Sequence, residues 1–517
     1  MGRYPTVKDI DIRKKLVIVR CGLDVPLDSK KDLLDPARVT DDTRIKDIIP
    51  TLRYLIENDA KVILAAGWCG RPKGEDADYS MAPVAKRLEK ILKENGLLRA
   101  DVLIAPNSYD GRPRSVYKNK EEVKRIVQNL SKSQVVVLEN VRYDSEANAN
   151  DKEFASFFAS LGQVYINENE VQNHRPEATI VEVPKIIAKK GGRVAYGFQY
   201  ANVLENIGGL QERLKNPNRA PFVFGLCGKK IESDPGITSK ITVALDLIDK
   251  MKKGDVIITG GAVVYTFLLA EHYKGKIEAN LSKVKDMVAR YNKDIVEKTK
   301  STKDKEAAKK LVDDLQKEKS SGLKELLGIT DSEIKSLVGS SYIRWGQEGE
   351  QIVFAYDLMA KASAKGIEVI TAIDHTITNS PPDKAGKLPE SAEIKIHPSR
   401  TGIPLGYLGI AEGPKTLDKI SEAIKKAAIY LQSGPYSIED DKVEKLSHTD
   451  KVTFMAAKAC KDKGGITIAA GGDTVARINS RKAHDSFSTM TSAGGATLEL
   501  INGSSAGRDA IKEALNQ

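Results

Sequence analysis

The sequence predicts an α/β protein built from two doubly wound, Rossmann-like parallel-sheet domains. Short runs rich in valine and isoleucine recur along the chain, separated by amphipathic segments long enough to form helices. This pattern is typical of parallel strands that helices bury on both faces. The runs fall into two series, and 517 residues are too many for a single hydrophobic core. We therefore expect one sheet in each half of the chain.

Ten strands are predicted, five in each series. Those of the first series lie at residues 15–20, 61–66, 101–106, 134–140 and 163–168. Those of the second series lie at residues 222–228, 255–261, 368–374, 427–435 and 466–473. Because each run is continuously apolar rather than alternating, both sheets are expected to be covered by helices on their two faces.

The domain boundaries follow from this spacing. We expect an N-terminal domain at residues 1–201, a hinge helix or linker at 202–220, and a C-terminal domain at 221–499. A tail at 500–517 is expected to pack back on the N-terminal domain. Residues from about 273 to 340 are rich in lysine and glutamate and carry a helical pattern without a strand signal. They predict a helical insertion on the surface, either a solvated excursion or an arm that docks a protein partner.

Composition narrows the classes of partner. The formal charge of +10 suits nucleic acid or anionic metabolites, but no interleaved aromatic and basic motif is present, so we expect no nucleic-acid binding. No apolar run reaches the length of a membrane span and no apolar leader begins the chain, so no membrane association is expected. The four cysteines are widely scattered, which favours a reducing, cytoplasmic location.

The residues that follow the strands differ between the two halves. The first half supplies arginines, which clamp carboxylates and phosphates through paired hydrogen bonds. The second half supplies glycines, which let backbone N–H groups approach phosphates closely. The sequence thus predicts a small anionic substrate on the first domain and a nucleotide on the second. The arginines are Arg44, Arg71, Arg142 and Arg175, and the glycines are Gly228, Gly260, Gly261, Gly434, Gly471, Gly472, Gly494 and Gly495.

Ten segments in chain order resemble motifs of the phosphoglycerate kinase family, along nearly the whole chain outside the insertion. VTDDTRI matches almost to the letter, CGRPKG stands for the family's LGRPKG, and NHRPEA stands for AHRAHA. The segments are VIVRCGLDVP (17–26), VTDDTRI (39–45), CGRPKG (69–74), VVVLENVRY (135–143), NHRPEA (173–178), PFVFGLCGKK (221–230), IITGGAVVYTF (257–267), GPKT (413–416), AAGGDTVA (469–476) and TSAGGATLEL (491–500).

This resemblance implies reversible phosphoryl transfer between 1,3-bisphosphoglycerate and ADP, a step of glycolysis. It implies Mg²⁺ with ATP or ADP as cofactor, a small phosphorylated carboxylic acid as the other ligand, and a cytoplasmic monomer. Such a transfer needs positioning and charge neutralisation more than covalent help.

The resemblance also carries residue roles. It implies catalytic roles for Arg44, Lys230 and Gly494. On the substrate side it implies contacts from Asp24, Arg44, Arg71, Arg142, His174 and Arg175. On the nucleotide side it implies contacts from Gly228, Lys230, Lys240, Gly409, Asp440, Gly472, Asp473, Thr474 and Gly495, with Asp473 as the residue linked to the metal ion.

Several ligand positions depart from the family's pattern. On the substrate side Gly22 replaces an aspartate, Asp24 an asparagine, and Trp68 and Glu177 histidines. On the nucleotide side Thr259, Ala470 and Ala493 replace the first glycine of three triplets, Ser433 replaces an asparagine and Asp440 a glutamate. Three readings stay open: an active but divergent kinase, a degenerate member with a structural or docking role, and a phosphotransferase with another substrate. A dinucleotide dehydrogenase and a P-loop NTPase are disfavoured, because G-x-G-x-x-G after a strand and G-x-x-x-x-G-K-[ST] are both missing.

Overall fold

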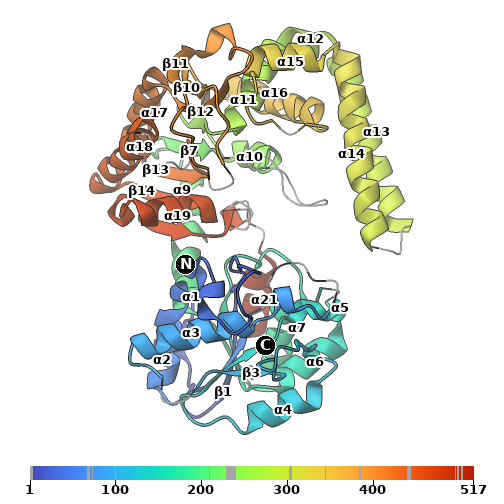
Figure 1. Cartoon of the computed structure of the whole chain (residues 1–517), viewed down its shortest axis with the longest axis vertical. Helices are drawn as coiled ribbons and strands as arrows, with labels where there is room; N and C mark the ends of the chain where they lie inside the picture. Colours follow the sequence, from blue (N-terminus) through green and yellow to red (C-terminus); the bar gives the residue numbers. More distant parts are fainter. Residues whose placement is uncertain are drawn as a thin grey trace. The chain divides into compact units, whose positions relative to one another are not determined.

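The computed structural model divides into two compact units, which Figure 1 shows with their elements labelled. Unit 1 comprises Met1–Leu210 and Glu499–Gln517, and unit 2 comprises Gln211–Leu498. The residues that the structure describes are 4–66, 70, 72, 74–98, 101–148, 150–208, 210–228, 240–301, 305–343, 345–383, 386–438, 444–494, 497, 500, 501, 503 and 505–516.

Unit 1 is built on a six-stranded parallel sheet with the order β3-β4-β2-β1-β5-β6. The chain adds strands on one side of β1 and then crosses to the other side with β5. The strand order therefore reverses between β1 and β5, and the carboxyl ends of these two strands form a topological switch point, where α/β proteins bind ligands. The strands are β1 Leu16–Cys21, β2 Lys61–Ala65, β3 Leu103–Ala105, β4 Val135–Leu138, β5 Val164–Glu168 and β6 Arg193–Tyr196.

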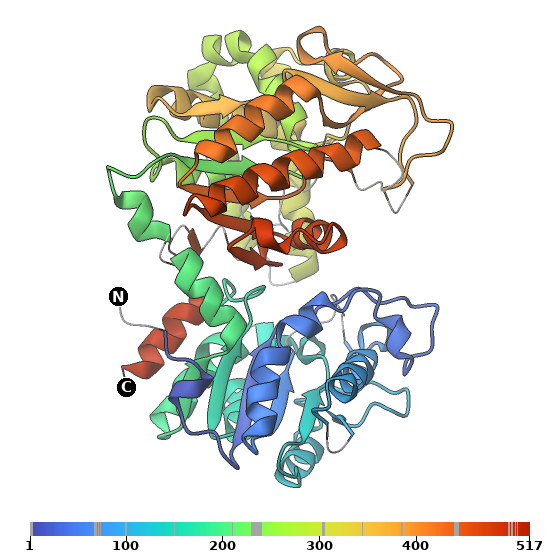
Figure 2. The same cartoon turned by 90° about the vertical axis from the view of Figure 1, so that its left-hand side faces the viewer.

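Helices cover both faces of this sheet by burying one apolar side each. In α3, for example, Val84, Leu88, Ile91 and Leu92 are buried and follow a helical spacing. The last helix, α21, packs on α7 (Figures 1 and 2). The helices are α1 Thr43–Asp47, α2 Ile49–Glu57, α3 Ala82–Glu94, α4 Lys120–Gln128, α5 Ser145–Asn148, α6 Lys152–Ser160, α7 Ala178–Lys189, α8 Phe198–Val203, α9 Leu210–Lys215, which extends into unit 2, and α21 Ala506–Leu515.

Unit 2 repeats the principle with a second six-stranded parallel sheet of order β15-β14-β13-β7-β8-β9. Its switch point lies between β7 and β13. A smaller antiparallel sheet of order β11-β10-β12 belongs to the same unit. The strands are β7 Phe222–Leu226, β8 Val256–Thr259, β9 Glu368–Ile370, β10 Asp374–Thr378, β11 Ile394–Pro398, β12 Leu408–Glu412, β13 Ile429–Ser433, β14 Ile466–Ala470 and β15 Thr489–Thr491.

The helices of unit 2 include a pair, α17 and α18, that lie side by side (Figure 2). Short turns connect most helices to the strands that follow them, as expected of doubly wound sheets. The helices are α10 Lys240–Ile248, α11 Val263–His272, α12 Lys274–Ala279, α13 Leu281–Ser301, α14 Lys305–Leu327, α15 Asp331–Val338, α16 Glu348–Ala364, α17 Pro414–Lys426, α18 Glu444–Asp462 and α19 Gly472–Ser480.

The charged segment from about 273 to 340 forms α12 to α15, with α13 and α14 packed against each other (Figure 1). The part of α14 that contacts α16 is buried and is held by ion pairs. Lys319 of α14 and Glu350 of α16 form a buried ion pair with 2.5 Å between Nζ and Oε1. Lys324 of α14 also pairs with the buried Glu348 of α16. The hairpin is therefore fastened to α16 by charges that solvent does not screen.

All ten predicted strands are present, most of them shorter than predicted by one to three residues at an end. The sequence missed β6, β15 and the antiparallel sheet of β10, β11 and β12. Strand β6 begins with an exposed arginine and β15 reads Thr-Met-Thr, so neither shows a continuous apolar run. Strand β10 is buried but reads Asp-His-Thr-Ile-Thr, and β11 is half-buried or exposed throughout, so neither shows the continuous apolar run by which buried parallel strands are recognised.

Among the described helices, none combines the length and hydrophobicity that crossing a bilayer requires. The described cysteines, Cys21, Cys227 and Cys460, are all unpaired and buried.

Replacing Glu350 with alanine should leave the Lys319 ammonium buried, with the Asn292 amide oxygen at 3.0 Å as its one remaining side-chain acceptor among the residues that the structure describes. We expect the free energy of unfolding of unit 2 to fall by about 3–5 kcal/mol, measured by urea unfolding followed by circular dichroism. The double variant Lys319→Met/Glu350→Leu removes both charges and should be clearly more stable than Glu350→Ala. Equal stability of the two variants would contradict the proposed fastening.

Candidate functional site

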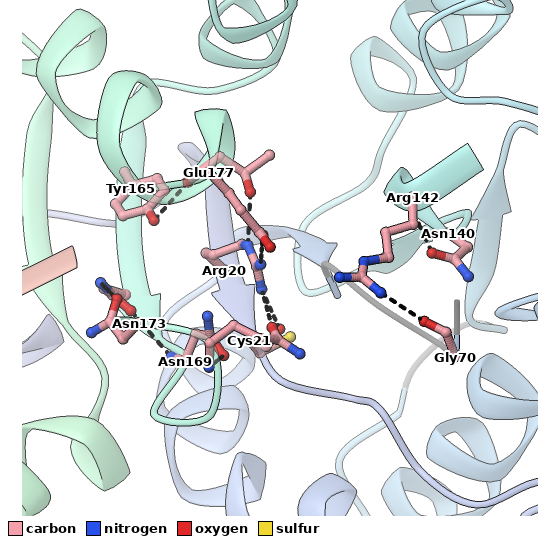
Figure 3. A network of polar contacts seen from close by, with 12 residues as sticks. Arg20, Cys21, Gly70, Asn140, Arg142, Tyr165, Asn169, Asn173 and Glu177 are labelled. Carbon is pink, nitrogen blue, oxygen red and sulfur yellow. Dashed lines mark hydrogen bonds and ion pairs between the residues drawn. The ribbon is translucent and has the colours of Figure 1, made fainter. Parts of the chain in front are cut away.

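A buried arginine organises the switch point of unit 1 (Figure 3). Arg20 of β1 is 0% exposed and makes four hydrogen bonds. Its Nε donates to Thr179 Oγ1 at 2.9 Å, and Nη1 donates to the Cys21 carbonyl at 2.8 Å and to Gln172 Oε1 at 3.2 Å. Its Nη2 lies 3.2 Å from Glu177 Oε2. Arg20 thus ties β1 to the loop that follows β5 and to the start of α7.

Glu177 brings a negative charge of the chain's own into the region predicted to bind an anion. Its side chain is 8% exposed. Burial raises the pKa of Glu177, while the charges of Arg20, Arg142 and Arg175 act in the opposite direction. Two of the predicted substrate arginines therefore lie close enough to act on this carboxylate, whereas the family's pattern has a histidine there.

Asp24, Arg44 and Arg142 converge on Gly70, in the loop after β2. Arg44 Nη1 donates to the Asp24 carbonyl and lies 3.8 Å from Asp24 Oδ2. The N–H of Gly70 donates to Asp24 Oδ1 at 3.0 Å, and Arg142 Nη1 donates to the Gly70 carbonyl at 3.2 Å. Gly70 has a φ of +64°, and a Cβ on it would lie 2.2 Å from the Tyr79 ring. The loop can therefore pass between these side chains only with glycine at this position.

His174 lies beside Arg175 in the loop after β5. Burial, with a smaller effect from Arg175, lowers the pKa of His174 to about 4, so the imidazole is neutral near pH 7. Within the part of the chain that the structure describes, its Nδ1 has no hydrogen-bond partner. His174 can therefore offer a hydrogen bond to an anion but no charge.

The space beside Gly22 is already occupied. A Cβ on Gly22 would lie 3.0 Å from Asn169 Oδ1 and 3.3 Å from Val171 Cγ2. An aspartate like that of the family would fit only if these neighbours moved. The close packing of Asn169 and Val171 therefore favours glycine at this position.

In unit 2, three turns that contain glycine pack closely on one another at the switch point between β7 and β13, with backbone atoms in direct contact. A Cβ on Gly434 would lie 2.1 Å from the Cys227 carbonyl oxygen, and one on Gly261 would lie 2.9 Å from the Gly228 nitrogen. Gly228, Gly261 and Gly434 all have positive φ, between 62° and 99°. No other residue type would allow this approach. The N–H groups of Gly261 and Gly434 hold the turns in place by donating to Glu412 Oε1 at 2.9 Å and to Thr474 Oγ1 at 3.0 Å.

Lys240, the first residue of α10, spans the same switch point. Its Nζ donates to the Cys227 carbonyl at 2.9 Å and to the Ser433 carbonyl at 3.3 Å, which are the ends of β7 and β13. Ser433 is fully buried, and its Oγ has no hydrogen-bond partner among the described residues. A cation and a buried hydroxyl therefore lie where the two strand series diverge.

The amino-terminal end of α19 lies at this edge as well. Its N-cap is Gly471, with a φ of +107° and no side chain that caps the helix. Thr474 Oγ1 accepts the Gly434 N–H at 3.0 Å and donates to the Ala470 carbonyl at 3.2 Å, which ties α19 to the turn after β13. A Cβ on Gly494 would lie 3.4 Å from the Gly471 Cα. Uncapped N–H groups at a helix start suit phosphate oxygens.

The remaining predicted residues divide into three groups. Gly409 lies on β12, where an added Cβ would lie 1.8 Å from the Tyr265 hydroxyl. The Tyr265 side chain therefore already fills the space beside Gly409. The Cβ-bearing replacements Thr259, Ala470 and Ala493 are buried, and Thr259 Oγ1 donates to the Ile370 carbonyl at 3.2 Å. Outside the described residues lie Trp68, Arg71, Lys230, Asp440 and Gly495.

A magnesium–nucleotide complex fits the donors at the start of α19. Asp473 is exposed in the first turn of the helix, and a Cβ on Gly472 would meet nothing within 4 Å. Across the described ranges, no three His, Cys, Asp or Glu side chains are arranged to hold a metal ion. A single carboxylate beside a phosphate-binding turn is a typical arrangement for Mg²⁺ that the nucleotide itself carries.

Sequence reasoning overlooked Arg20 and Glu412. The signal for Arg20 was present, since an arginine interrupts the otherwise apolar run KLVIVR and a charge there must be paired once it is buried. Glu412, next to GPKT, gave no comparable signal, because its strand belongs to the sheet that was missed.

The family model described as phosphoglycerate kinase matches residues 7–322 and 333–504. The chain belongs to the phosphoglycerate kinase family. As a member of this family it is a kinase, and the resemblance noted in the sequence is confirmed.

Relatives and solved structures agree with this membership. The chain is 29% identical over 499 residues to a phosphoglycerate kinase from Clostridium kluyveri, with 96% of each chain covered. It is 28% identical over 500 residues to one from Clostridium botulinum, again covering 96% of each. Its fold is similar to that of a phosphoglycerate kinase from Coxiella burnetii, with a TM-score of 0.62 and 20% identity over 99% of this chain and 100% of the other. It is also similar to that of one from Pyrococcus horikoshii, with a TM-score of 0.65 and 18% identity over 99% of each chain.

Changing Glu177 to glutamine keeps its shape but removes the charged partner of the buried Arg20. We expect the free energy of unfolding of unit 1 to fall by about 1.5–3 kcal/mol, the value of a hydrogen bond to a charged group. Urea unfolding followed by circular dichroism measures this. Glu182→Gln, on the same helix α7 but only half-buried, is the matched control and should be near neutral. If Glu177→Gln leaves the free energy of unfolding unchanged, the ion pair with Glu177 does not contribute to holding Arg20 in place.

Proposed function

We propose that the chain catalyses reversible phosphoryl transfer between 1,3-bisphosphoglycerate and ADP, as glycolytic members of its family do, in the cytoplasm. The observation that carries the proposal is the convergence of glycine turns, Lys240 and the start of α19 at the switch point of unit 2. The uncapped N–H groups at the start of α19 and the Lys240 ammonium, at the carboxyl end of a parallel sheet, suit a nucleoside di- or triphosphate.

Unit 1 is assigned the phosphoglycerate side of the reaction. Arg44, Arg142 and Arg175 supply guanidinium groups that can clamp a carboxylate or a phosphate with paired hydrogen bonds. His174, neutral near pH 7, can add a hydrogen bond. Because phosphoryl transfer spreads charge over the equatorial oxygens, we assign Arg44 the stabilisation of that charge.

On the nucleotide side we assign phosphate contacts to Gly228, Gly472 and Gly494 and a charge contact to Lys240. Asp473 would hold the Mg²⁺ that accompanies the nucleotide, and Thr474 keeps the helix start in place through Gly434. The ion, when bound, neutralises part of the phosphate charge. The same roles are proposed, on the family resemblance alone, for Lys230, Asp440 and Gly495, with Gly409 on the base or ribose side and Arg71 on the phosphoglycerate side.

A second candidate is a degenerate family member with little activity and a structural or docking role. It is favoured by the two carboxylates that this chain places among its predicted substrate arginines. Asp24 pairs with Arg44, and Glu177 lies close enough to Arg142 and Arg175 for their charges to act on it, so an anionic ligand must compete with groups already present. Competition of this kind weakens binding without removing the positive charges that catalysis needs.

The proposal predicts turnover of ATP and 3-phosphoglycerate, measured by coupling the product to NADH oxidation. Arg44→Ala should lower kcat by about a hundredfold or more, because a preorganised donor to the developing charge is lost. Arg53→Ala is the matched control, since Arg53 is a partly exposed arginine of α2 that contacts Glu57 and Asn95, and should leave kcat unchanged.

Turnover that Arg44→Ala does not reduce would contradict the assignment of Arg44. If wild-type protein shows no turnover, calorimetry with MgADP separates the alternatives. Binding without turnover would support the degenerate reading, and no heat at millimolar MgADP would contradict any nucleotide-dependent function.

Asp24→Asn tests whether the Asp24 carboxylate competes with substrate for Arg44. Since the pair is 3.8 Å apart and partly exposed, removing the charge should lower the KM for 3-phosphoglycerate by up to about fivefold, the upper value of such a pair. Asp28→Asn, at a partly exposed aspartate of the same region, should leave KM unchanged. A raised KM in Asp24→Asn would instead show that the carboxylate itself contacts the substrate.

A further inference from the structure

The buried Glu412 holds the Gly260–Gly261 turn through a hydrogen bond to its backbone. Glu412, the last residue of β12, is 2% exposed. Its Oε1 accepts the N–H of Gly261 at 2.9 Å, and a Cβ on Gly260 would lie 2.9 Å from the same oxygen. The Gly260–Gly261 turn thus rests on this carboxyl group, and Gly261 in turn packs against Gly228 and Pro435 at the switch point.

The second oxygen of this carboxyl group has no partner. Glu412 Oε2 is buried and accepts or donates no hydrogen bond among the residues that the structure describes. An ionised carboxylate in this position leaves an unsolvated negative charge, whereas the protonated acid is neutral. Burial raises the pKa of Glu412 to about 8, although the Gly261 N–H favours the ionised form.

Other ionisable groups surround Glu412. Burial lowers the pKa of His375, its partner across the sheet, to about 4, and raises the pKa values of Cys227, Tyr265 and Tyr436. Asp450 forms an ion pair with Arg477 at 3.2 Å. The facing groups are Cys227 after β7, Tyr265 on α11, His375 on β10, Tyr436 after β13, Asp450 on α18 and Arg477 on α19.

We propose that Glu412 is a positioning residue for the nucleotide, which holds the Gly260–Gly261 turn and couples nucleotide binding to the uptake of a proton. The inference rests on the proposed function. An ionised Glu412 places a negative charge directly beneath a turn that receives a polyanion, and protonation removes that repulsion. Nucleotide affinity therefore falls as pH rises through the range in which Glu412 ionises.

Calorimetric titration of the full chain with MgADP between pH 6.5 and 9 tests this coupling. Glu412→Gln keeps an oxygen that can accept the Gly261 N–H but cannot ionise. We expect the two proteins to bind MgADP equally at pH 6.5. By pH 9 the Kd of the wild type should have risen about fivefold more than that of Glu412→Gln, as expected if nucleotide raises the pKa of Glu412 by about one unit.

A second readout needs no variant. Repeating the wild-type titration near pH 8 in two buffers of different ionisation enthalpy reports proton uptake on binding, which should exceed that of Glu412→Gln. His375→Asn is the matched control, because it alters the residue paired with Glu412 across the sheet without removing the acid, and should keep the wild-type pH dependence.

The outcomes separate this inference from the proposed function. Absence of MgADP binding at every pH would contradict the proposed function and the inference together. Binding whose pH dependence and proton uptake are the same in wild type and Glu412→Gln would overturn the inference alone. If Glu412→Gln does not fold, absence of proton uptake by the wild type near pH 8 would overturn it equally.

Discussion

The reversal of strand order beside the first strand of each sheet is the constraint on which the rest of the structure depends. At that point two neighbouring crossovers leave in opposite directions, so the strand ends are not covered by a connecting helix. In unit 1 the gap lies between β1 and β5, and in unit 2 between β7 and β13. The predicted ligand residues that the structure describes gather mainly at these ends because only there can loops from several strands meet.

The gap between the diverging crossovers is filled differently in the two units. Unit 1 fills its gap with side chains, and the buried Arg20 holds the loop after β5 through four hydrogen bonds. Unit 2 fills its gap with backbone, since Gly228, Gly261 and Gly434 approach too closely for any Cβ. Side-chain charge suits a small compact anion, and the uncapped N–H groups at the start of α19, which these turns hold in place, suit a chain of phosphates.

Carboxylates of the chain's own are a common element of both regions. Asp24 faces Arg44, Glu177 faces Arg20, and Glu412 lies beneath Gly261. Each lies where an anionic ligand or its binding loop is expected, so its negative charge, when ionised, opposes binding of that ligand. The proposed competition at Arg44 and the proposed proton coupling at Glu412 both follow from this feature.

The sequence by itself determined the fold class, the ten apolar strands and the family, because continuous apolar runs and ordered motifs are local properties that need no contact to be recognised. It also determined which residue types stand at the strand ends. Only the tertiary structure decided what those residues do to one another. The burial of Arg20, the pairing of Asp24 with Arg44 and the support of Gly261 by Glu412 join residues far apart in the chain. Their energies depend on desolvation, which the sequence does not reveal.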